Sequence, residues 1–295
     1  MECVHPGICH LGEGPVWHPG RQQLFWTDIF ERTLWVYDPA AGTSRPFWQG
    51  ELQVGGFAFT RTGSLVLCTD RGVFLQLVSA EKGAPDQTPR LIADVTLAEG
   101  EMFNDITTDP WGRIFAGTLD RRRLTSTLYR LEKGASPVTV LEGIQCSNGM
   151  TFSMDQRRFF HTDSLAYRNT RYEYDRDSGA IRNPVVYYQG REWEGLPDGI
   201  TIDLEDHLWV AFWGAGVVRR LDPRGRIAAE VQIPARQPSS VMFGGKDLDT
   251  LYVTSAAQGA ADLSTGRDEN GDFLGGPVYR FTPGVRGRPE WAADF

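Results

Sequence analysis

A unit of three strand-like stretches recurs six times along the chain, and this repeat constrains the fold more than any other feature. Each copy has a short apolar stretch, a polar turn, a second stretch of alternating character, a gap, and a third stretch that ends near a charged turn. The six copies begin with EGPVW, GGFAF, NDITT, NGMTF, DGITI and SSVMF. Their first positions are separated by 42, 49, 44, 50 and 41 residues and are Glu13, Gly55, Asn104, Asn148, Asp198 and Ser239.

This spacing is that of a propeller blade, since four-stranded blades repeat about every 40–50 residues. The stretches are rich in Val, Ile, Phe, Trp and Tyr and are separated by Gly, Asp and Pro, as strands and turns are. No segment keeps a helical period for three turns. We therefore predict an all-β fold, a six-bladed β-propeller that spans residues 1–295 as a single domain. The alternative, a two-sheet sandwich or a pair of small β domains, does not account for the sixfold spacing.

The N-terminal stretch MECVHPGIC lies outside the six copies. We expect it to add an outer strand to the last blade, because an open ring would expose an unpaired sheet edge. The stretch lacks the basic and apolar regions of a signal peptide, and no run approaches the roughly 20 apolar residues that cross a bilayer. We therefore expect a cytoplasmic protein with no membrane partner.

Charge and cysteine usage narrow the possible partners and cofactors. The net charge is −8, so the phosphate backbone of nucleic acid is not expected to attract the chain. The cysteines show no CxxC spacing, and we interpret all four, Cys3, Cys9, Cys68 and Cys146, as buried free thiols. The five histidines form no HxH or HExxH motif, which argues against a zinc site built from histidine.

The six equivalent positions are expected to meet in space, because the loops that enter the innermost strands of a propeller gather at one mouth of its channel. Five of these positions carry a side-chain oxygen, and none is apolar. Carboxylate and amide oxygens without His or Cys suit a hard divalent cation such as Ca²⁺, Mg²⁺ or Mn²⁺. The alternative is that these residues only form turns before strands. Glutamate is a poor turn former, so the residue at position 13 favours a metal site.

Five motifs in the chain resemble the SMP-30/gluconolactonase/luciferin-regenerating-enzyme family, which includes regucalcin. They occur in order between about residues 10 and 282 and are LGEGPVWHP, FNDITTDPWGRIFAGTL, CSNGMTFSMD…FFHTDS, LPDGITIDLEDHLWVAFWGAGVVRRLDP and VMFGGKDLDTLYVTSA. The resemblance implies a propeller with a central metal site that opens a sugar-derived lactone. It also implies one divalent ion as cofactor, Ca²⁺, Zn²⁺, Mn²⁺ or Mg²⁺, and a small aldonolactone as partner.

The resemblance also assigns roles to residues, motif by motif. It implies that the metal is held by Glu13, Asn148 and Asp198, and that Asp198 is the acid–base residue. The asparagine of the FND motif, Asn104, is expected to face the substrate and a bound water. Repeat position alone selects the same four residues.

Lactone opening is chemistry that such a site can perform. A lactone is an ester whose carbonyl carbon accepts water through a tetrahedral oxyanion, and a divalent cation stabilises that charge. Asp198 is expected to take a proton from water or to return one to the leaving ring oxygen. Cys146 lies two residues before Asn148, but its motif contains no histidine, so we interpret it as a packed thiol and not as a nucleophile.

The substrate contacts depart from the family pattern. Members that act on simple aldonolactones often carry Arg two residues before the FND asparagine, where this chain has Met102, preceded by Glu101. After AGT the family often has an acidic residue; this chain has Asp120, which is followed by Arg121, Arg122 and Arg123. We predict that the substrate is bound by Glu101, Met102, Arg121 and Arg122. One or two of the guanidinium groups would hold an anionic group at the far end of the lactone; the alternative is a solvated charged loop.

Two other functions suit a propeller of this kind. One is a calcium-dependent phosphotriesterase that hydrolyses organophosphates, and the other is a non-catalytic calcium-binding or scaffold propeller. A plain scaffold does not need polar groups at all four channel positions, so we favour the enzyme. The second-strand aromatics Trp26, Trp209 and Trp213 are expected to fill space between blades, and His161 is expected to be structural.

Overall fold

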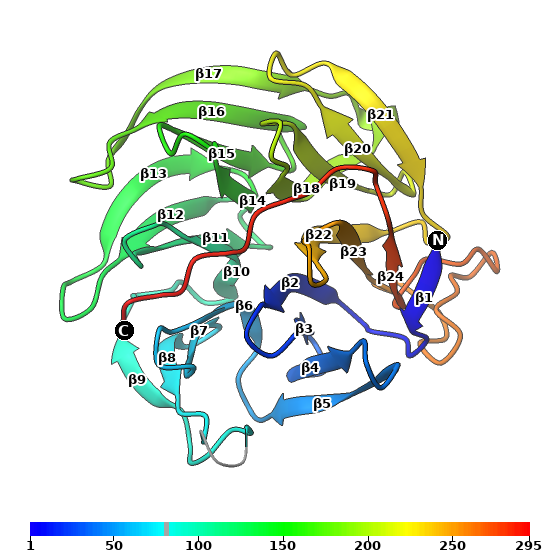
Figure 1. Cartoon of the computed structure of the whole chain (residues 1–295), viewed down its shortest axis with the longest axis horizontal. Coiled ribbons are helices and arrows are strands. Elements are labelled where there is room, and N and C mark those ends of the chain that lie inside the picture. Colours follow the sequence, from blue (N-terminus) through cyan, green and yellow to red (C-terminus); the bar gives the residue numbers. More distant parts are fainter. Residues whose placement is uncertain (80–82) are drawn as a thin grey trace.

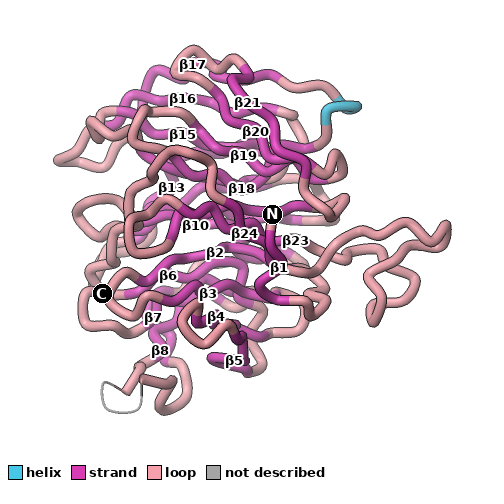
Figure 2. Tube along the Cα trace, turned by 45° about the vertical axis from the view of Figure 1, so that its right-hand side comes forward, coloured by secondary structure: helices cyan, strands magenta, loops and turns pink. Residues whose placement is uncertain are grey.

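The computed structural model describes residues 1–79 and 83–295. In this part of the chain, 24 strands form six four-stranded antiparallel sheets. The sheets are arranged around a central axis like the blades of a propeller (Figure 1). The predicted all-β, six-bladed fold is confirmed. Apart from one 3-10 helix at Glu192–Glu194, Figure 2 shows strands and loops throughout the described residues.

Each blade runs outward in chain order from its innermost strand. Blade 1 contains β2 (Gly12–His18), β3 (Gln23–Asp28), β4 (Thr33–Asp38) and β5 (Thr43–Gln49). Blade 2 contains β6 (Val54–Phe59), β7 (Leu65–Thr69), β8 (Gly72–Gln76) and β9 (Arg90–Ala93). Blade 3 contains β10 (Glu101–Thr108), β11 (Ile114–Asp120), β12 (Ser126–Leu131) and β13 (Val138–Ile144).

The second half of the ring follows the same order. Blade 4 contains β14 (Ser147–Phe152), β15 (Arg158–Asp163), β16 (Arg168–Tyr174) and β17 (Ile181–Gln189). Blade 5 contains β18 (Leu196–Ile202), β19 (Leu208–Trp213), β20 (Val217–Leu221) and β21 (Ile227–Gln232). Blade 6 contains β22 (Pro238–Gly244), β23 (Thr250–Ser255) and β24 (Val278–Phe281), and its outer strand is β1 (Glu2–His5).

The ring is closed by the N-terminal strand, as predicted. β1 pairs antiparallel with β24, and Glu2 lies opposite Arg280 and forms an ion pair with it. The pairing joins the two ends of the repeat array and covers the edge that blade 6 would otherwise expose. The pairing also corrects one expectation about the cysteines. All four are free, and three are buried as predicted, but Cys3 is exposed because it lies on this outermost strand.

Apolar side chains form one core cluster between each pair of neighbouring blades. Phe25 of blade 1, for example, packs against Phe57 of blade 2 in one cluster. In the cluster between blades 5 and 6, Trp209 packs with Phe243, and in the cluster between blades 6 and 1, Trp26 packs with Tyr252. Because each sheet is covered on both faces, its inner strands are apolar on both sides, which accounts for the near-continuous hydrophobic runs. Trp26 and Trp209 fill space between blades as expected.

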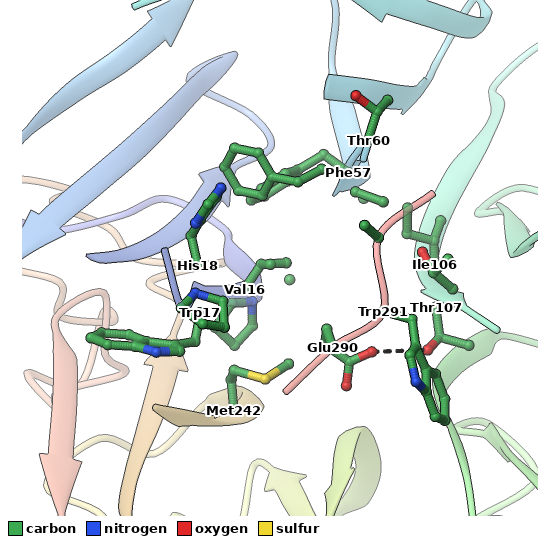
Figure 3. A pocket seen from close by; sticks show the side chains of 18 of the residues that line it. Val16, Trp17, His18, Phe57, Thr60, Ile106, Thr107, Met242, Glu290 and Trp291 are labelled. Carbon is green, nitrogen blue, oxygen red and sulfur yellow. Dashed lines mark hydrogen bonds between the residues drawn. The ribbon is translucent and has the colours of Figure 1, made fainter. Parts of the chain in front are cut away.

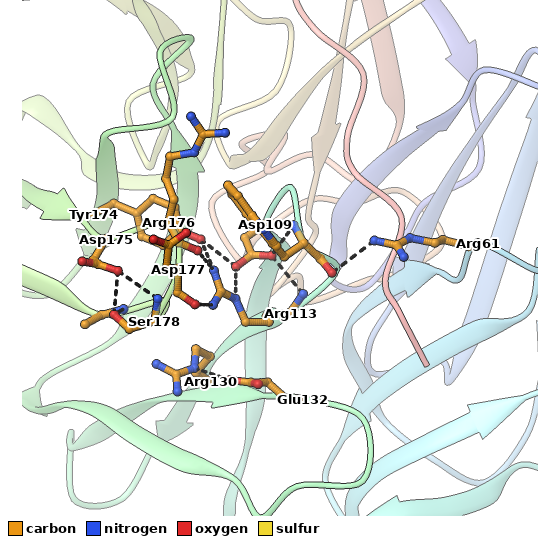
Figure 4. Close-up of polar contacts among 12 residues, drawn as sticks. Arg61, Asp109, Arg113, Arg130, Glu132, Tyr174, Asp175, Arg176, Asp177 and Ser178 are labelled. Atoms are coloured by element: carbon orange, nitrogen blue, oxygen red, sulfur yellow. Dashed lines mark hydrogen bonds and ion pairs between the residues drawn. The ribbon is translucent and has the colours of Figure 1, made fainter.

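A buried polar network fastens blade 3 to blade 4 (Figure 4). The Arg113 guanidinium forms an ion pair with Asp109, whose carboxylate also accepts a hydrogen bond from the Tyr174 hydroxyl at 2.7 Å. Arg113 Nη1 and Nη2 donate to the backbone carbonyls of Asp177 and Arg176, in the turn after β16. Every charged group of the network is therefore paired.

Replacing Arg113 by leucine is expected to lower the free energy of unfolding by about 3–5 kcal/mol, because it leaves the buried Asp109 carboxylate without its cation. Urea unfolding of this variant, of Asp109→Asn and of the double variant measures the coupling of the pair. If Arg113→Leu unfolds at the wild-type urea concentration, the network does not stabilise the fold.

The C-terminal segment, residues 286–295, crosses one face of the ring, and Figure 1 shows it in red. Backbone hydrogen bonds connect it to four blades, through Leu204, Leu248, Phe59 and Gly112. Arg288 is buried, and its guanidinium donates a hydrogen bond to the Thr151 hydroxyl of blade 4. The segment therefore runs along the end of the channel at which the innermost strands finish. No helix in the described residues could span a membrane.

Candidate functional site

A cavity of about 510 Å³ opens at the mouth of the channel where the innermost strands begin. Four of the five polar residues at the equivalent positions line it, namely Glu13, Asn104, Asn148 and Asp198. Its walls come from blades 1, 3, 4, 5 and 6 and consist of Leu11, Glu13, Asn104, Leu119, Arg121, Leu124, Cys146, Asn148, Ser164, Leu165, Leu196, Asp198, Trp213, Gln237, Gln258 and Gly259. Residues from near the two ends of the repeat array, such as Leu11 and Gln258, thus meet in one place.

A β-bulge occurs at the same place in all six innermost strands. The register against the second strand shifts between Glu13 and Val16 in blade 1 and at the equivalent points of the other five blades. A bulge interrupts the alternation of a strand and changes the direction of a side chain. The repeated bulge therefore explains how Glu13, Asn148 and Asp198 occupy the cavity although their strands continue into the core.

Glycine follows the polar residue in the EGP, SNG and PDG motifs because the innermost strands approach closely there. A Cβ atom on Gly149 would lie 2.4 Å from the Asp198 carbonyl oxygen. On Gly199 it would lie 2.0 Å from the Ser240 hydroxyl. Gly14 has a positive φ of 53°, which favours glycine. The three motifs thus combine a polar side chain with the close backbone packing that narrows the channel.

Two buried oxygen atoms in this cavity have no hydrogen-bond partner among the described residues. They are Oδ1 of Asn148 and Oδ1 of Asp198. Glu13 is also buried, and its Oε2 accepts a long hydrogen bond of 3.2 Å from the Gly14 N–H. Leaving such atoms unpaired costs free energy, so a group that supplies positive charge is expected between them.

The electrostatics of the site also favour a bound cation. Burial, with a smaller contribution from the Asp105 carboxylate, raises the pKa of Glu13 to about 8. The Gly14 N–H and the Arg121 guanidinium lower this pKa, but by less. Burial and then the carboxylates of Glu13 and Asp105 raise the pKa of Asp198 well above its ordinary value. Three carboxyl groups so close together repel one another when ionised. A dication would relieve this repulsion and displace their protons.

The donor set fits a hard divalent ion. Two carboxylates balance a 2+ charge, and the Asn148 amide adds a neutral oxygen. The described residues hold no group of three or more His, Cys, Asp and Glu side chains that could bind a metal. The fit therefore depends on the amide oxygen of Asn148 as third ligand. Burial raises the pKa of the Cys146 thiol, so this residue stays neutral and is a poor metal ligand and nucleophile.

The other three equivalent positions have different surroundings. Asn104 lines the cavity, and its Nδ2 donates to the Ser147 carbonyl at 3.0 Å, which fixes the amide plane. Ser239 is buried outside the cavity, and its hydroxyl donates to the Gly12 carbonyl of blade 1. Gly55 has no space for a side chain, because a Cβ atom there would lie 1.9 Å from the Phe103 carbonyl oxygen.

The three consecutive arginines have different environments. Arg121 lines the cavity, with its guanidinium 4.6 Å from the centre of the Phe30 ring. Arg122 forms an exposed ion pair with Glu99 at 2.9 Å. Arg123 is also exposed and lies 3.7 Å from the Asp120 carboxylate. Of the three, Arg121 alone is among the residues that line the cavity.

Glu101 and Met102 lie beside the cavity and are not among its lining residues. The Glu101 carboxylate accepts hydrogen bonds from the Thr118 hydroxyl at 2.6 Å and from the Ala98 N–H at 2.9 Å. Met102 is buried in a small apolar cluster with Leu11. In this arrangement both residues support the wall of the cavity.

Among the lining residues that were not expected in the site are Ser164, Gln237 and Trp213. Ser164 follows the second strand of blade 4, and Gln237 precedes the first strand of blade 6. Trp213 ends the second strand of blade 5 and faces the cavity as well as its neighbours, contrary to the expectation that it only fills space between blades. The HTDS motif was a possible signal for Ser164, but nothing in the sequence distinguished Gln237.

A second cavity, of about 500 Å³, lies at the opposite mouth (Figure 3). Glu290 of the C-terminal segment lies there, 3.5 Å from the Thr107 hydroxyl. Asp105 lines this second cavity and also affects Glu13 and Asp198, so it lies between the two mouths. Burial raises the pKa of Asp105 to about 7. None of the residues predicted for the site lines this second cavity.

Comparison with known proteins agrees with the motifs. The sequence profile of the SMP-30/Gluconolactonase/LRE-like region matches residues 11–257. Pentonolactonase XacC from Haloferax volcanii is 36% identical over 287 residues, which cover 97% of this chain and 95% of that protein. The 6-deoxy-6-sulfogluconolactonase from Pseudomonas putida is 34% identical over 260 residues, which cover 88% of this chain and 87% of that protein.

A solved structure supports the same relationship. The calcium-binding protein regucalcin from Agrobacterium tumefaciens superposes with a TM-score of 0.88 and 25% sequence identity, covering 99% of this chain and 97% of that one. Fold, motifs and relatives thus agree over nearly the whole length. The chain belongs to the SMP-30/gluconolactonase/LRE-like family.

Proposed function

We propose that this protein is a metal-dependent hydrolase that opens the ring of a sugar-derived lactone at the mouth of its channel. The observation that carries the proposal is the pair of buried oxygens on Asn148 and Asp198 that lack a partner in the described part of the chain, next to the buried Glu13 carboxylate. Relatives named for pentonolactone and sulfogluconolactone hydrolysis support a sugar lactone as substrate. The ion would be held by Glu13, Asn148 and Asp198.

The chemistry divides between the ion and the side chains of this chain. A divalent ion, when bound, polarises a carbonyl group and neutralises the negative charge that develops on its oxygen. Asp198 takes a proton from the water whose oxygen attacks the lactone carbonyl carbon. The same carboxyl returns that proton to the ring oxygen as the ring C–O bond breaks. The product is the open hydroxy acid.

Asn104 would orient the attacking water. Its Nδ2 is held by the Ser147 carbonyl, and its Oδ1 makes no hydrogen bond in the described part of the chain. A fixed acceptor at this point can hold one proton of the water while Asp198 takes the other. Such positioning contributes a large part of the rate of lactone hydrolysis, because a misplaced nucleophile reacts far more slowly.

We further propose that Arg121 selects lactones with a terminal anionic group. Its guanidinium is held against the Phe30 ring, and its planar fork suits a carboxylate, sulfonate or phosphate. Arg121→Met is expected to lower kcat/KM for a terminally acidic aldonolactone about ten- to a hundredfold, since such a bond contributes about 1.5–3 kcal/mol. The rate on the neutral counterpart is expected to change little.

Arg123→Met serves as the matched control, because Arg123 belongs to the same run and is exposed outside the cavity. Steady-state rates on both lactones are measured for the three proteins. Equal losses in Arg121→Met and Arg123→Met would contradict a role in anion recognition. A higher kcat/KM of the wild type on the neutral lactone than on the acidic one would also contradict this role.

One experiment tests the proposed function against its alternatives. A pH-stat follows acid release from aldonolactones and from an organophosphate on one preparation, before and after chelation, with circular dichroism as a check on folding. We expect lactone opening that is lost on chelation while the fold remains. Faster organophosphate hydrolysis would favour a calcium-dependent phosphotriesterase. No hydrolysis, together with tight Ca²⁺ binding, would favour a non-catalytic calcium-binding propeller.

A further inference from the structure

Two more buried polar atoms in the same cavity have no oxygen or nitrogen hydrogen-bond partner among the described residues. They are the Ser164 hydroxyl oxygen and Oε1 of Gln237. Neither belongs to the proposed metal site, and neither has a task in the reaction described above. Unpaired polar atoms are rare in protein interiors, so each calls for a partner from outside the chain.

Ser164 is held in position by its backbone. It is only 3% exposed, and its N–H donates to the Cys146 carbonyl at 3.1 Å. Its hydroxyl interacts with the neutral Cys146 thiol, a weak hydrogen-bonding partner, and with no oxygen or nitrogen atom of the described residues. A hydroxyl can both donate and accept, so Ser164 can bind a sugar hydroxyl in either sense.

Gln237 is held by both its backbone and its amide. Its backbone N–H donates to the Leu274 carbonyl at 2.8 Å, and its Nε2 donates to the Gln258 carbonyl at 3.1 Å. The amide is thereby oriented, which leaves Oε1 as an acceptor in the wall of the cavity. An acceptor of this kind requires a donor on the ligand.

The two atoms lie on either side of the acid–base residue. Ser164 belongs to blade 4 and Gln237 to blade 6, and Asp198 belongs to blade 5 between them. The cavity wall also contains the largely apolar side chains Leu165, Leu196 and Trp213. A lactone ring at Asp198 would therefore bring its substituents towards both polar atoms.

We infer that Ser164 and Gln237 hydrogen-bond hydroxyl groups of the lactone and so restrict the site to polyhydroxylated lactones. The inference rests on the proposed lactonase function and deepens it. A lactone with a bare hydrocarbon ring leaves both atoms unpaired in the closed complex, and sites built to bind a substrate hydroxyl reject analogues that lack it.

The test compares a hydroxylated and a bare ring on single variants of the holoenzyme. Ser164→Ala and Gln237→Met are each expected to lower kcat/KM for an aldonolactone about tenfold, mainly through KM, since one hydrogen bond is lost. The rate on unsubstituted δ-valerolactone is expected to stay at the wild-type value. A merely structural role would lower both rates in parallel.

Two variants serve as matched controls. Ser239→Ala removes a buried hydroxyl whose hydrogen bonds are satisfied within the chain. Gln76→Met removes a buried amide in blade 2, outside the cavity. Both are expected to lower the unfolding temperature and to leave the ratio of the two rates unchanged.

Aldonolactones that each lack one hydroxyl keep the inference testable if a variant does not fold. For each of the two residues, one deoxy lactone lacks the hydroxyl that the residue binds. The wild type is expected to open that lactone with a kcat/KM about tenfold lower than for the full aldonolactone. In the variant that lacks the same residue, removing the hydroxyl is expected to cause no further loss of kcat/KM. An unchanged ratio of rates in both variants, with no discrimination against deoxy lactones, overturns the inference alone. A wild type that opens no lactone overturns the proposed function as well.

Discussion

Replacing Asp198 by asparagine is expected to slow lactone opening about 10³-fold or more while the propeller remains folded. The substitution keeps the shape of the side chain but removes the proton acceptor, and general acid–base catalysis alone contributes roughly 10²–10⁴-fold. It also removes one of the two carboxylates that would balance the metal charge. The measurement combines kcat, metal content and circular dichroism on the purified variant.

The stability of the metal-free variant separates a functional role from a structural one. The folded-state pKa of Asp198 is raised by burial, so the ionised carboxylate destabilises the metal-free protein once the pH exceeds the unfolded value of about 3.9. Removing the charge is therefore expected to leave the thermal midpoint at pH 7 in chelator equal to or above that of the wild type. A much lower midpoint would mean that Asp198 stabilises the fold.

Asp175→Asn is the control for this series, because Asp175 caps an exposed turn in blade 4. It is expected to retain wild-type activity and metal binding. Wild-type activity in Asp198→Asn would rule out the proposed mechanism. Loss of activity in both variants would point to a general effect of removing acidic charge.

Asn148→Ala and Asn104→Ala are expected to impair the enzyme in different ways. Both residues lie at equivalent positions of neighbouring blades, so the pair is matched in backbone surroundings. Asn148 offers an unpartnered buried oxygen, and its loss is expected to weaken metal binding at least about tenfold. Asn104 is expected to act on the water, so its loss should lower kcat about 10²-fold with metal still bound.

Titration with Ca²⁺, Mn²⁺ and Zn²⁺ measures the first effect, and rates at saturating metal measure the second. If excess metal restores Asn148→Ala but not Asn104→Ala, the two roles are distinct. Equal losses of metal affinity in the two variants would mean that both amides are ligands.

Much of the fold and the centre of the candidate site could be predicted from the sequence, because both follow from the repeat. Each blade repeats the same strand and turn pattern, so its limits can be recognised locally. The closing of the ring by residues 2–5 followed from the need to cover an open edge. Glu13, Asn104, Asn148 and Asp198 could be selected because equivalent positions in a closed ring must meet, whatever the details of side-chain packing.

The tertiary structure decided which loop residues reach the cavity. Arg121, Arg122 and Arg123 are indistinguishable by residue type, and their separation depends on Phe30 of blade 1 and on the acidic groups Glu99 and Asp120. The sequence predicted Glu101 as a substrate-binding residue as well. Its carboxylate is instead held beside the cavity by hydrogen bonds from Thr118 and Ala98.

The same limit applies to the residues that sequence reasoning missed. The direction of the Gln237 amide depends on the Gln258 carbonyl, and the burial of the Ser164 hydroxyl depends on the neighbouring blade walls. The exposure of Cys3 and the position of residues 286–295 at the second channel mouth likewise depend on segments distant in sequence. The repeat encodes the backbone of each blade locally, so the sequence by itself determined the ring and the four polar positions at its mouth. The direction of a loop side chain is set by contacts with other blades, so only the tertiary structure decided the walls of the site.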